Sequence, residues 1–142
     1  MTPRCILLVE DNPDDEALTR RGLQQAGWSG DIRAARDGAA ALDALEQMQP
    51  PPALVLLDLK LPKLDGIDVL RRIRENDRTR GLCVVMFTSS SEARDIARCH
   101  ALGCNGYVVK PMAYDQYLDA VLRISRDWLQ PAPALQVQSL PK

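Results

Sequence analysis

Acidic side chains follow two apolar runs of the sequence, at positions where a carboxylate can bind a metal ion or act as a nucleophile. Glu10 and Asp11 come directly after the run 5–9, and Asp58 comes after the run 53–57. If both runs are strands of one parallel sheet, their carboxyl ends meet at one edge, and the three carboxylates repel one another unless a cation lies among them. Oxygen ligands of this kind suit Mg²⁺. We therefore predict a Mg²⁺ site beside Asp58.

A hydroxyl and an amino group follow two further apolar runs. Thr88 comes after the run 83–87, and Lys110 comes after the run 107–109. A phosphorylated Asp58 requires such groups, because an ammonium pairs with a phosphoryl oxygen and a hydroxyl donates a hydrogen bond to another. Taken singly, Thr88 fits a helix cap and Lys110 a surface residue equally well. Together the four strand ends favour an aspartyl phosphate at Asp58.

The elements that would position these groups are five short apolar runs that alternate with five segments of helical periodicity. Continuous apolar runs such as Leu-Val-Leu-Leu are typical of strands that are covered on both faces. The alternation predicts an α/β fold, a (βα)₅ flavodoxin-like doubly wound parallel sheet with strand order 2-1-3-4-5. The strands are expected at 5–9, 31–35, 53–57, 83–87 and 107–109, and the helices at 14–27, 37–48, 65–76, 91–103 and 113–129.

Length and composition fit one globular domain. The chain has 142 residues, of which 46% are hydrophobic and 26% charged, and its formal net charge is −1. This balance gives no reason to expect nucleic-acid binding, and no apolar run approaches the ~20 residues of a membrane span. We expect a cytoplasmic protein with one domain over 1–129 and a flexible tail over 130–142, which is too short for a DNA-binding output module.

Four cysteines occur, and their spacing gives neither a C-x-x-C pair nor a zinc-ligand pattern with His100, the single histidine. Cys5 and Cys83 lie in strand-like runs, which indicates small buried side chains. Cys99 and Cys104 flank the expected end of a helix, where we expect exposure. Redox or metal chemistry at these thiols is disfavoured.

The motifs that carry this chemistry resemble those of two-component response-regulator receiver domains over about residues 4–129. The resemblance implies that Asp58 accepts phosphate from a sensor histidine kinase and that the protein is a phosphoacceptor rather than an enzyme with its own substrate. It further implies that Glu10, Asp11, Asp58 and the Lys60 backbone carbonyl hold Mg²⁺. The motifs are VEDN (9–12), LLDLKLPKLDG (56–66), FTSS (87–90) and GYVVKP (106–111).

The same resemblance assigns roles after the phosphorylation step. Thr88 and Lys110 bind the phosphoryl group, and Pro111 matches a proline whose preceding peptide bond is commonly cis. Tyr107 matches the switch aromatic, which rotates into the space that Thr88 leaves when it moves toward the phosphate. A half-buried strand tyrosine with its hydroxyl in water is the alternative for Tyr107. Gly66 matches the turn after the phosphorylation loop.

Among receivers, the chain looks like the stand-alone regulators associated with bacterial and cyanobacterial phytochromes. This resemblance implies a phytochrome-type histidine kinase as the partner. It also implies a homodimer through the helix 91–103, the strand 107–109 and the helix 113–129. On that face we expect Tyr107, Met112, Tyr114 and Tyr117.

Three other functions remain open from the residues alone. A flavodoxin-like electron carrier shares the fold, but the acidic segment after the first strand would repel a flavin phosphate. A hydrolase with an aspartate nucleophile would use the same groups, but it usually needs a second acid and a substrate-capping insertion that the segment after Asp58 does not offer. A receiver-fold adaptor without phosphorylation would not need the intact set of acidic, hydroxyl and lysine groups.

Overall fold

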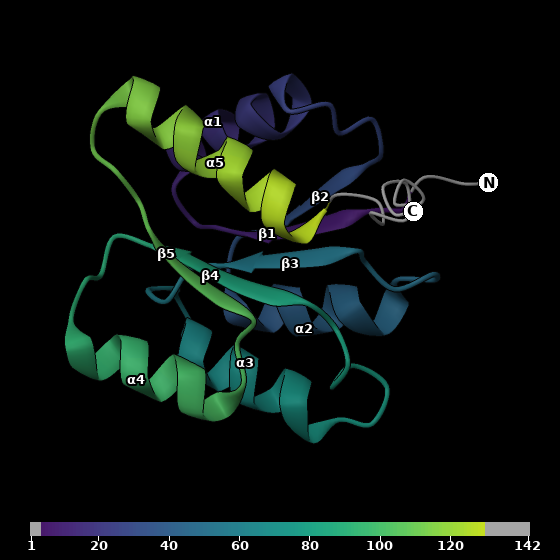
Figure 1. The fold of residues 1–142 in the computed structure, drawn as a ribbon. Coiled ribbons are helices and arrows are strands. Elements are labelled where there is room, and N and C mark those ends of the chain that lie inside the picture. Colours follow the sequence, from purple (N-terminus) through teal and green to yellow (C-terminus); the bar gives the residue numbers. More distant parts are fainter. Residues whose placement is uncertain (1–3, 130–142) are drawn as a thin grey trace, which may run out of the picture.

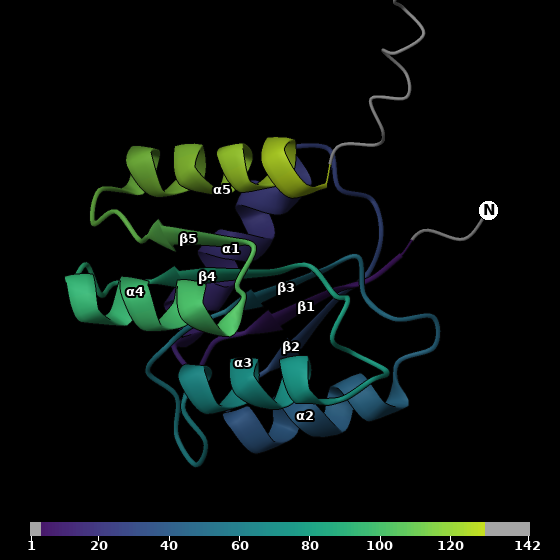
Figure 2. The ribbon, with the colours of Figure 1, turned by 60° about the horizontal axis from the view of Figure 1, so that its bottom comes forward.

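The chain forms a parallel β-sheet with helices on both faces, as the ribbons show (Figures 1 and 2). The structure is a computed structural model, and it describes residues 4–129. The predicted tail, 130–142, lies outside the described residues. The strands are β1 (Ile6–Val9), β2 (Ile32–Ala35), β3 (Leu54–Leu57), β4 (Val84–Thr88) and β5 (Gly106–Val109). The helices are α1 (Pro13–Gln25), α2 (Gly38–Gln47), α3 (Gly66–Glu75), α4 (Ala93–Leu102) and α5 (Tyr114–Trp128).

The strand order is β2-β1-β3-β4-β5, and every neighbouring pair is parallel, so the predicted flavodoxin-like fold is confirmed. In the register, Val9 pairs with Leu57 of β3, and Leu57 pairs with Met86 of β4. The arrowheads of β3, β4 and β5 point to the same side in Figure 1. Residues that follow these strands therefore emerge at one edge, which we call the carboxyl edge.

Alternate residues of the strands point to opposite faces and form two apolar cores. Leu7 and Val9 pack into the core shared with α2, α3 and α4, whereas Ile6 and Leu8 pack into the core shared with α1 and α5. Figure 1 shows the same division, with α1 and α5 on one face of the sheet and the other three helices on the opposite face. All four residues of β1 and of β3 are buried, which explains their unbroken apolar sequence.

Polar side chains fix where three helices begin. Asn12 accepts hydrogen bonds from the backbone N–H groups of Asp14 and Asp15 at the start of α1. Asp37 and Asp65 cap α2 and α3 in the same way. Each cap directly precedes its helix near the carboxyl edge, so the caps also set how the loops at that edge are oriented.

Helices α1 and α5 pack closely, and their packing shows that the expected exposure of Tyr117 is wrong. A Cβ atom on Gly22 of α1 would lie 2.8 Å from a methyl carbon of Val121 of α5, so only glycine allows this approach. Tyr117 lies in the same seam, 3% exposed, with its ring centroid 5.2 Å from that of Phe87. Its hydroxyl pairs with Thr19 Oγ1 at 2.8 Å. The expectation that Tyr117 lies on an exposed dimer face is wrong, because its helix turns it toward the sheet.

The expectation of exposure at Cys99 and Cys104 is also wrong. Cys99 is 0% exposed because it lies on the side of α4 that packs against the sheet. Helix α4 then ends at Gly103 in the left-handed conformation, and this turn folds Cys104 back so that its N–H donates to the Cys99 carbonyl at 3.1 Å. No helix within residues 4–129 is long and apolar enough to cross a membrane.

Candidate functional site

Three carboxylates meet at the carboxyl edge, where β1 and β3 end. The Asp58 N–H donates to the Val9 carbonyl at 3.1 Å, which keeps the two strand ends side by side. Glu10, Asp11 and Asp58 each place an oxygen so that all three oxygens lie within 4.8 Å of one another. Glu10 and Asp58 are buried and Asp11 is exposed, so a cation bound here would remain accessible from solvent on one side. The sequence-predicted cluster therefore forms.

Lys110 reaches this cluster from the end of β5, two strands away from Asp58. Its backbone N–H donates to the Thr88 carbonyl at 2.7 Å, which continues the β4–β5 pairing and fixes where the side chain starts. The ammonium donates to Asp58 Oδ2 at 2.8 Å, to Glu10 Oε1 at 2.5 Å and to Asp15 Oδ2 at 2.9 Å. Burial lowers the pKa of Lys110, but the hydrogen bonds to Asp58 and Glu10 outweigh this, and the net pKa is raised. Lys110 is thus a permanent cation.

The site carries more negative than positive charge. Lys110 pairs with Glu10, Asp15 and Asp58, and Asp11 belongs to the same group of carboxylates. Burial raises the pKa of Glu10, and the neighbouring Asp58 adds to this rise while Lys110 opposes it. A raised pKa means that the protein alone does not fully stabilise the ionised carboxylate at this position. An additional cation would do so.

The three carboxylates fit a hard divalent cation. Oxygens on opposite sides of an octahedral Mg²⁺ are about 4.2 Å apart and adjacent ones are closer, so three oxygens that all lie within 4.8 Å of one another are near enough to bind one ion. Within residues 4–129, this is the group of acidic, cysteine or histidine side chains close enough together to hold a metal ion. Carboxylates without thiols or imidazoles favour Mg²⁺ or Mn²⁺ over zinc or copper.

The loop after β3 holds Asp58 in place. The Lys60 N–H donates to Asp58 Oδ1 at 3.4 Å, and the Gly66 N–H donates to the Leu59 carbonyl at 2.8 Å. A Cβ atom on Gly66 would lie 2.1 Å from the Asp58 carbonyl oxygen, so α3 can begin this close to Asp58 only with glycine there. The Lys60 carbonyl as a metal ligand stays a prediction.

Thr88 and Tyr107 are both connected to Ser90, in the loop between β4 and α4. Thr88 is 0% exposed, and its Oγ1 accepts a hydrogen bond from the Ser90 N–H at 3.4 Å. The Tyr107 hydroxyl donates to the Ser90 carbonyl at 2.9 Å, so this hydroxyl is not simply in water. Ser90 Oγ in turn donates to Asp95 of α4 at 2.6 Å. A displacement of Thr88 would therefore be transmitted to Tyr107 and to the start of α4.

The expectation of a cis peptide bond before Pro111 is wrong. Within the described residues the cis peptide bond joins Gln49 to Pro50. The trans form of an X–Pro bond is favoured by only about 0.5–1 kcal/mol, so local packing decides the isomer and residue type alone does not. The Lys110 side chain reaches Glu10, Asp15 and Asp58 with the trans bond.

Asp15 is the member of the site that the sequence analysis missed. It lies in the first turn of α1, where an acidic residue is common because it interacts favourably with the helix N-terminus. The signal in the sequence is its position: Asp15 comes three residues after the N-cap Asn12, so it lies in the first turn of a helix that begins at the carboxyl edge.

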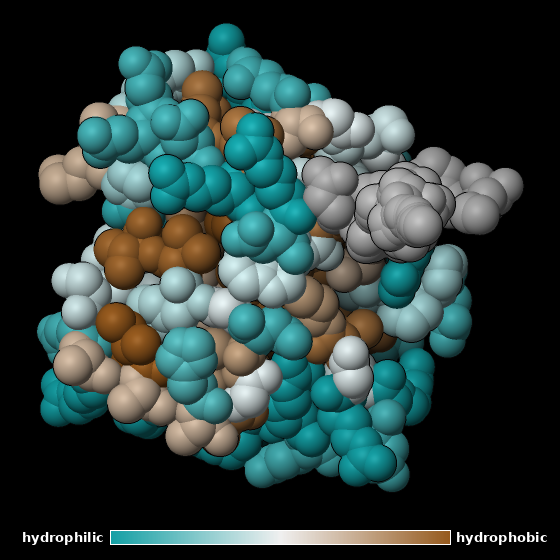
Figure 3. Space-filling view, in the orientation of Figure 1, coloured by the Kyte–Doolittle hydropathy of each residue, from teal (hydrophilic) through white to brown (hydrophobic). Residues whose placement is uncertain are grey.

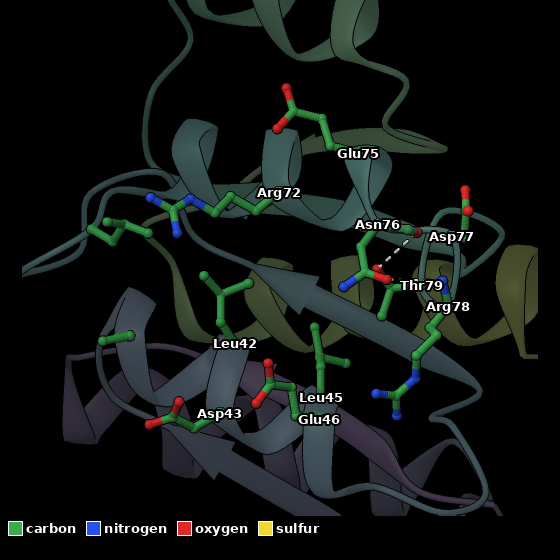
Figure 4. Close-up of a pocket in the computed structure, with 12 residues that line it drawn as sticks. Leu42, Asp43, Leu45, Glu46, Arg72, Glu75, Asn76, Asp77, Arg78 and Thr79 are labelled. Carbon is green, nitrogen blue, oxygen red and sulfur yellow. Dashed lines mark hydrogen bonds between the residues drawn. The ribbon is translucent and has the colours of Figure 1, made fainter.

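Two hollows in the surface differ in their relation to this site. A crevice of about 480 Å³ adjoins it, lined by residues that include Asp11, Lys60 and Arg98. A second hollow of about 750 Å³ lies between α2 and the end of α3 (Figure 4). Figure 4 shows charges of both signs around it, Asp43 and Glu46 opposite Arg72 and Arg78, and none of the predicted site residues lines it.

Comparisons with known proteins show which family the chain belongs to. Residues 6–122 match the family described as the response regulator receiver domain. The chain is 39% identical over 140 residues to the probable methanogenesis regulatory protein FilR2 of Methanothrix harundinacea, covering 93% of this chain and 90% of that protein. It is 35% identical over 133 residues to the response regulator Rcp1 of Synechocystis sp., covering 90% of each.

Solved structures give the same result. The Mn²⁺-bound form of Rcp1 matches with a TM-score of 0.85 and 34% identity, over 92% of this chain and 97% of that one. The phosphorylated cyanobacterial phytochrome response regulator RcpA matches with a TM-score of 0.86 and 32% identity, over 92% and 97%. The chain therefore belongs to the response-regulator receiver family, and it is related within that family to the phytochrome response regulators.

Proposed function

We propose that this protein accepts a phosphoryl group on Asp58 from a sensor histidine kinase, with Mg²⁺ bound beside it, and has no separate small-molecule substrate. One observation carries the proposal. At one edge of the sheet a buried aspartate, two further carboxylates and a buried lysine converge, and the lysine contacts the aspartate directly. Acyl-phosphate formation requires this combination of a nucleophile, a metal site and a cation for the phosphoryl oxygens.

The chemistry follows from the contacts of Asp58. A carboxylate oxygen of Asp58 attacks the phosphorus of a phosphohistidine, a P–O bond forms, and the P–N bond breaks with its electron pair going to the imidazole nitrogen. Asp58 Oδ2 is paired with Lys110 and Oδ1 accepts the Lys60 N–H, so the carboxylate is held in one orientation before the donor arrives. A bound Mg²⁺ would neutralise charge on the transferring phosphoryl group. Glu10, Asp11, Asp58 and the Lys60 carbonyl would hold it.

The conformational response would start at Thr88. After phosphorylation its hydroxyl would turn to a phosphoryl oxygen and give up the Ser90 N–H. Since Ser90 also holds the Tyr107 hydroxyl and Asp95, this change would release Tyr107 to rotate and alter the beginning of α4. Phosphorylation then shifts an equilibrium between two arrangements of the α4–β5–α5 face, because only one of them contacts the phosphoryl group well.

The α4–β5–α5 face has the exposed apolar side chains that a homodimer would bury. Val109, Met112 and Tyr114 are 39%, 101% and 48% exposed. Figure 3 shows apolar surface between α5 and α4, on the side of the edge strand β5. We propose a homodimer through this face, a phytochrome-type kinase as the donor, and neither nucleic acid nor membrane as a partner. A monomeric mass for wild type in sedimentation experiments, with and without beryllofluoride, would contradict the dimer; Met112→Glu should produce such a monomer.

Phosphotransfer separates this proposal from its alternatives. Wild type, Asp58→Asn and the control Asp65→Asn, which changes a helix-capping carboxylate seven residues away, would be incubated with acetyl phosphate or with phosphorylated histidine kinases. We expect Mg²⁺-dependent labelling of wild type and Asp65→Asn, loss of labelling in Asp58→Asn, and no labelling with EDTA. Labelling of Asp58→Asn at the wild-type level would overturn the site, and multiple turnover of a small phosphate ester would favour a hydrolase.

A further inference from the structure

The buried ammonium of Lys110 has a third carboxylate partner, Asp15, which lies outside the carboxylates that form the cation site. The Lys110 Nζ–Asp15 Oδ2 distance is 2.9 Å, close to the 2.8 Å of the contact with Asp58. The Lys110 side chain is 7% exposed and that of Asp15 is 29% exposed, so the pair lies at the rim of the site and is partly shielded from water. Such a charge-assisted hydrogen bond restrains a flexible lysine.

The position of Asp15 is set by its own backbone contacts. Its N–H donates to Asn12 Oδ1 at 3.1 Å, and its carbonyl oxygen accepts a hydrogen bond from the Tyr117 hydroxyl at 3.3 Å. That hydroxyl also pairs with Thr19. Helices α1 and α5 therefore both hold the backbone of Asp15, which fixes the point from which its carboxylate reaches Lys110.

Glu10 and Asp58, the other two partners of Lys110, are also candidate ligands of the divalent cation. An ammonium has three N–H donors, and Lys110 directs them to Glu10, Asp58 and Asp15. Glu10 and Asp58 also belong to the carboxylate cluster suited to a divalent cation, whereas Asp15 does not. When Glu10 binds a cation and Asp58 carries a phosphoryl group, both become weaker or altered partners for Lys110. Asp15 is the one whose contact with Lys110 is unaffected.

We propose that Asp15 is a positioning residue for Lys110, and this inference rests on the proposed function. Asp15 keeps the ammonium on the α1 side of the site, which lets Glu10 turn toward the divalent cation without leaving Lys110 unpaired. Without Asp15, Lys110 holds Glu10 more strongly, so the cation binds less well and the ammonium is less well placed for the phosphoryl oxygens. Asp14, the neighbouring acid of the same helical turn, has no ion pair with Lys110 within the described residues and provides the matched control.

The test compares Asp15→Asn with Asp14→Asn, which remove the same charge from the same turn of α1. Mg²⁺ binding to the full chain would be measured by calorimetry, and phosphorylation by acetyl phosphate would be followed in parallel. We expect Asp15→Asn to weaken Mg²⁺ binding by about threefold to tenfold and Asp14→Asn by less than about twofold. Asp15→Glu should restore most of the affinity, since a carboxylate is returned to the same position.

A double-mutant cycle separates the pairing with Lys110 from a general effect of charge. In a Lys110→Met background, the effects of Asp15→Asn and Asp14→Asn on Mg²⁺ affinity should become equal, because the partner is gone. NMR signals of the Lys110 ammonium provide a readout that needs neither metal nor phosphate. They should be protected from solvent exchange in wild type and Asp14→Asn, and lost or broadened in Asp15→Asn.

The outcomes distinguish this inference from the proposed function. If wild type binds Mg²⁺ and is phosphorylated while Asp15→Asn behaves like Asp14→Asn in both assays, Asp15 is only an acidic helix-start residue and the inference is overturned. If wild type neither binds Mg²⁺ nor accepts phosphate, the proposed function itself fails. Thermal unfolding of each variant identifies a folding defect. If Asp15→Asn has such a defect, Asp15→Glu is tested in its place. A Mg²⁺ affinity of Asp15→Glu well below that of wild type would then contradict the positioning role.

Discussion

Lys110 and Arg74 lie at opposite edges of the sheet, and one pairs with carboxylates whereas the other donates to neutral oxygens. Lys110, at the carboxyl edge, donates to three carboxylates. Arg74, at the end of α3, donates to the backbone carbonyls of Arg80, Leu82 and Gly103 at 2.8–3.0 Å and to the Asn105 side chain at 2.8 Å. These acceptors lie before β4 and before β5, so Arg74 fastens the edge where those strands begin.

The difference in partners separates a structural site from a functional one. Neutral carbonyl and amide oxygens accept the hydrogen bonds of Arg74 and do not repel one another as the carboxylates do, so its contacts join the segments around α3, β4 and β5 without needing a further ion. The carboxylates around Lys110 repel one another and remain in excess over it, so that edge can still gain a cation or a phosphoryl group and change its contacts. An arginine suits the first task because its planar group reaches several acceptors at once.

The largest expected effect comes from Lys110→Met. Loss of a charge-assisted hydrogen bond to the phosphoryl group should reduce phosphorylation of Asp58 by about tenfold to a hundredfold and abolish the conformational response. The rate of phosphorylation by acetyl phosphate measures the first effect. The change in the Tyr107 NMR signals on phosphorylation measures the conformational response. Lys63→Met is the control, because Lys63 pairs with Asp37 at 3.6 Å in an exposed position of the same edge. Equal rates of phosphorylation of Lys110→Met and Lys63→Met would contradict a functional role for Lys110.

Arg74→Met should lower stability and leave phosphorylation nearly unchanged, the opposite of what we expect for Lys110→Met. Its acceptors lose their donors, and we expect the free energy of unfolding to fall by about 1–3 kcal/mol, while phosphorylation of the folded protein changes by less than about twofold. Urea unfolding measures the first quantity. Arg72→Met, two residues earlier on the same helix and exposed, serves as the control and should be near neutral. A phosphorylation defect as large as that of Lys110→Met would show that the two edges are not separate.

A smaller effect is expected at Cys99, where burial of a thiol should make the free energy of unfolding depend on pH. Burial raises the pKa of the Cys99 thiol from 9.0 to about 11, and the nearby Cys104 adds to it. Between these values the unfolded chain loses the proton that the folded protein keeps, so the contribution of Cys99 to stability should decrease as pH rises above 9. The destabilisation caused by Cys99→Ala should therefore shrink by on the order of 1 kcal/mol between pH 8 and pH 11. A cost independent of pH would contradict the raised pKa.

The fold and the centre of the site follow from the sequence for physical reasons. Buried strands need unbroken apolar runs, and parallel strands deliver the residues after them to one edge, so β1, β3, β4 and β5 could be located along with Glu10, Asp58, Thr88 and Lys110. The strand order follows from the few topologies that right-handed crossovers allow. These features depend on periodicity and on position along the chain, which a single sequence contains.

The features that the sequence did not reveal depend on three-dimensional neighbours. Asp15 and Arg74 are of residue types common on helix surfaces, and only the folded chain shows which acceptors or donors they reach. The sequence does not show that Tyr117 is buried, because the buried face of a helix cannot be identified until its packing partner is known. The resemblance predicts a cis peptide bond before Pro111, but the two isomers differ too little in free energy for the residue types to decide.

The most direct test of the central claim is to identify the phosphorylated residue. Wild-type protein would be phosphorylated with acetyl phosphate and Mg²⁺, the acyl phosphate reduced with borohydride to the stable alcohol, and the modified residue located by mass spectrometry of peptides. The geometry of the carboxylates and Lys110 predicts modification at Asp58 alone, and only when Mg²⁺ is present. Modification at Glu10, Asp11 or Asp15 with Asp58 unmodified, or equal modification without a divalent cation, would contradict the account.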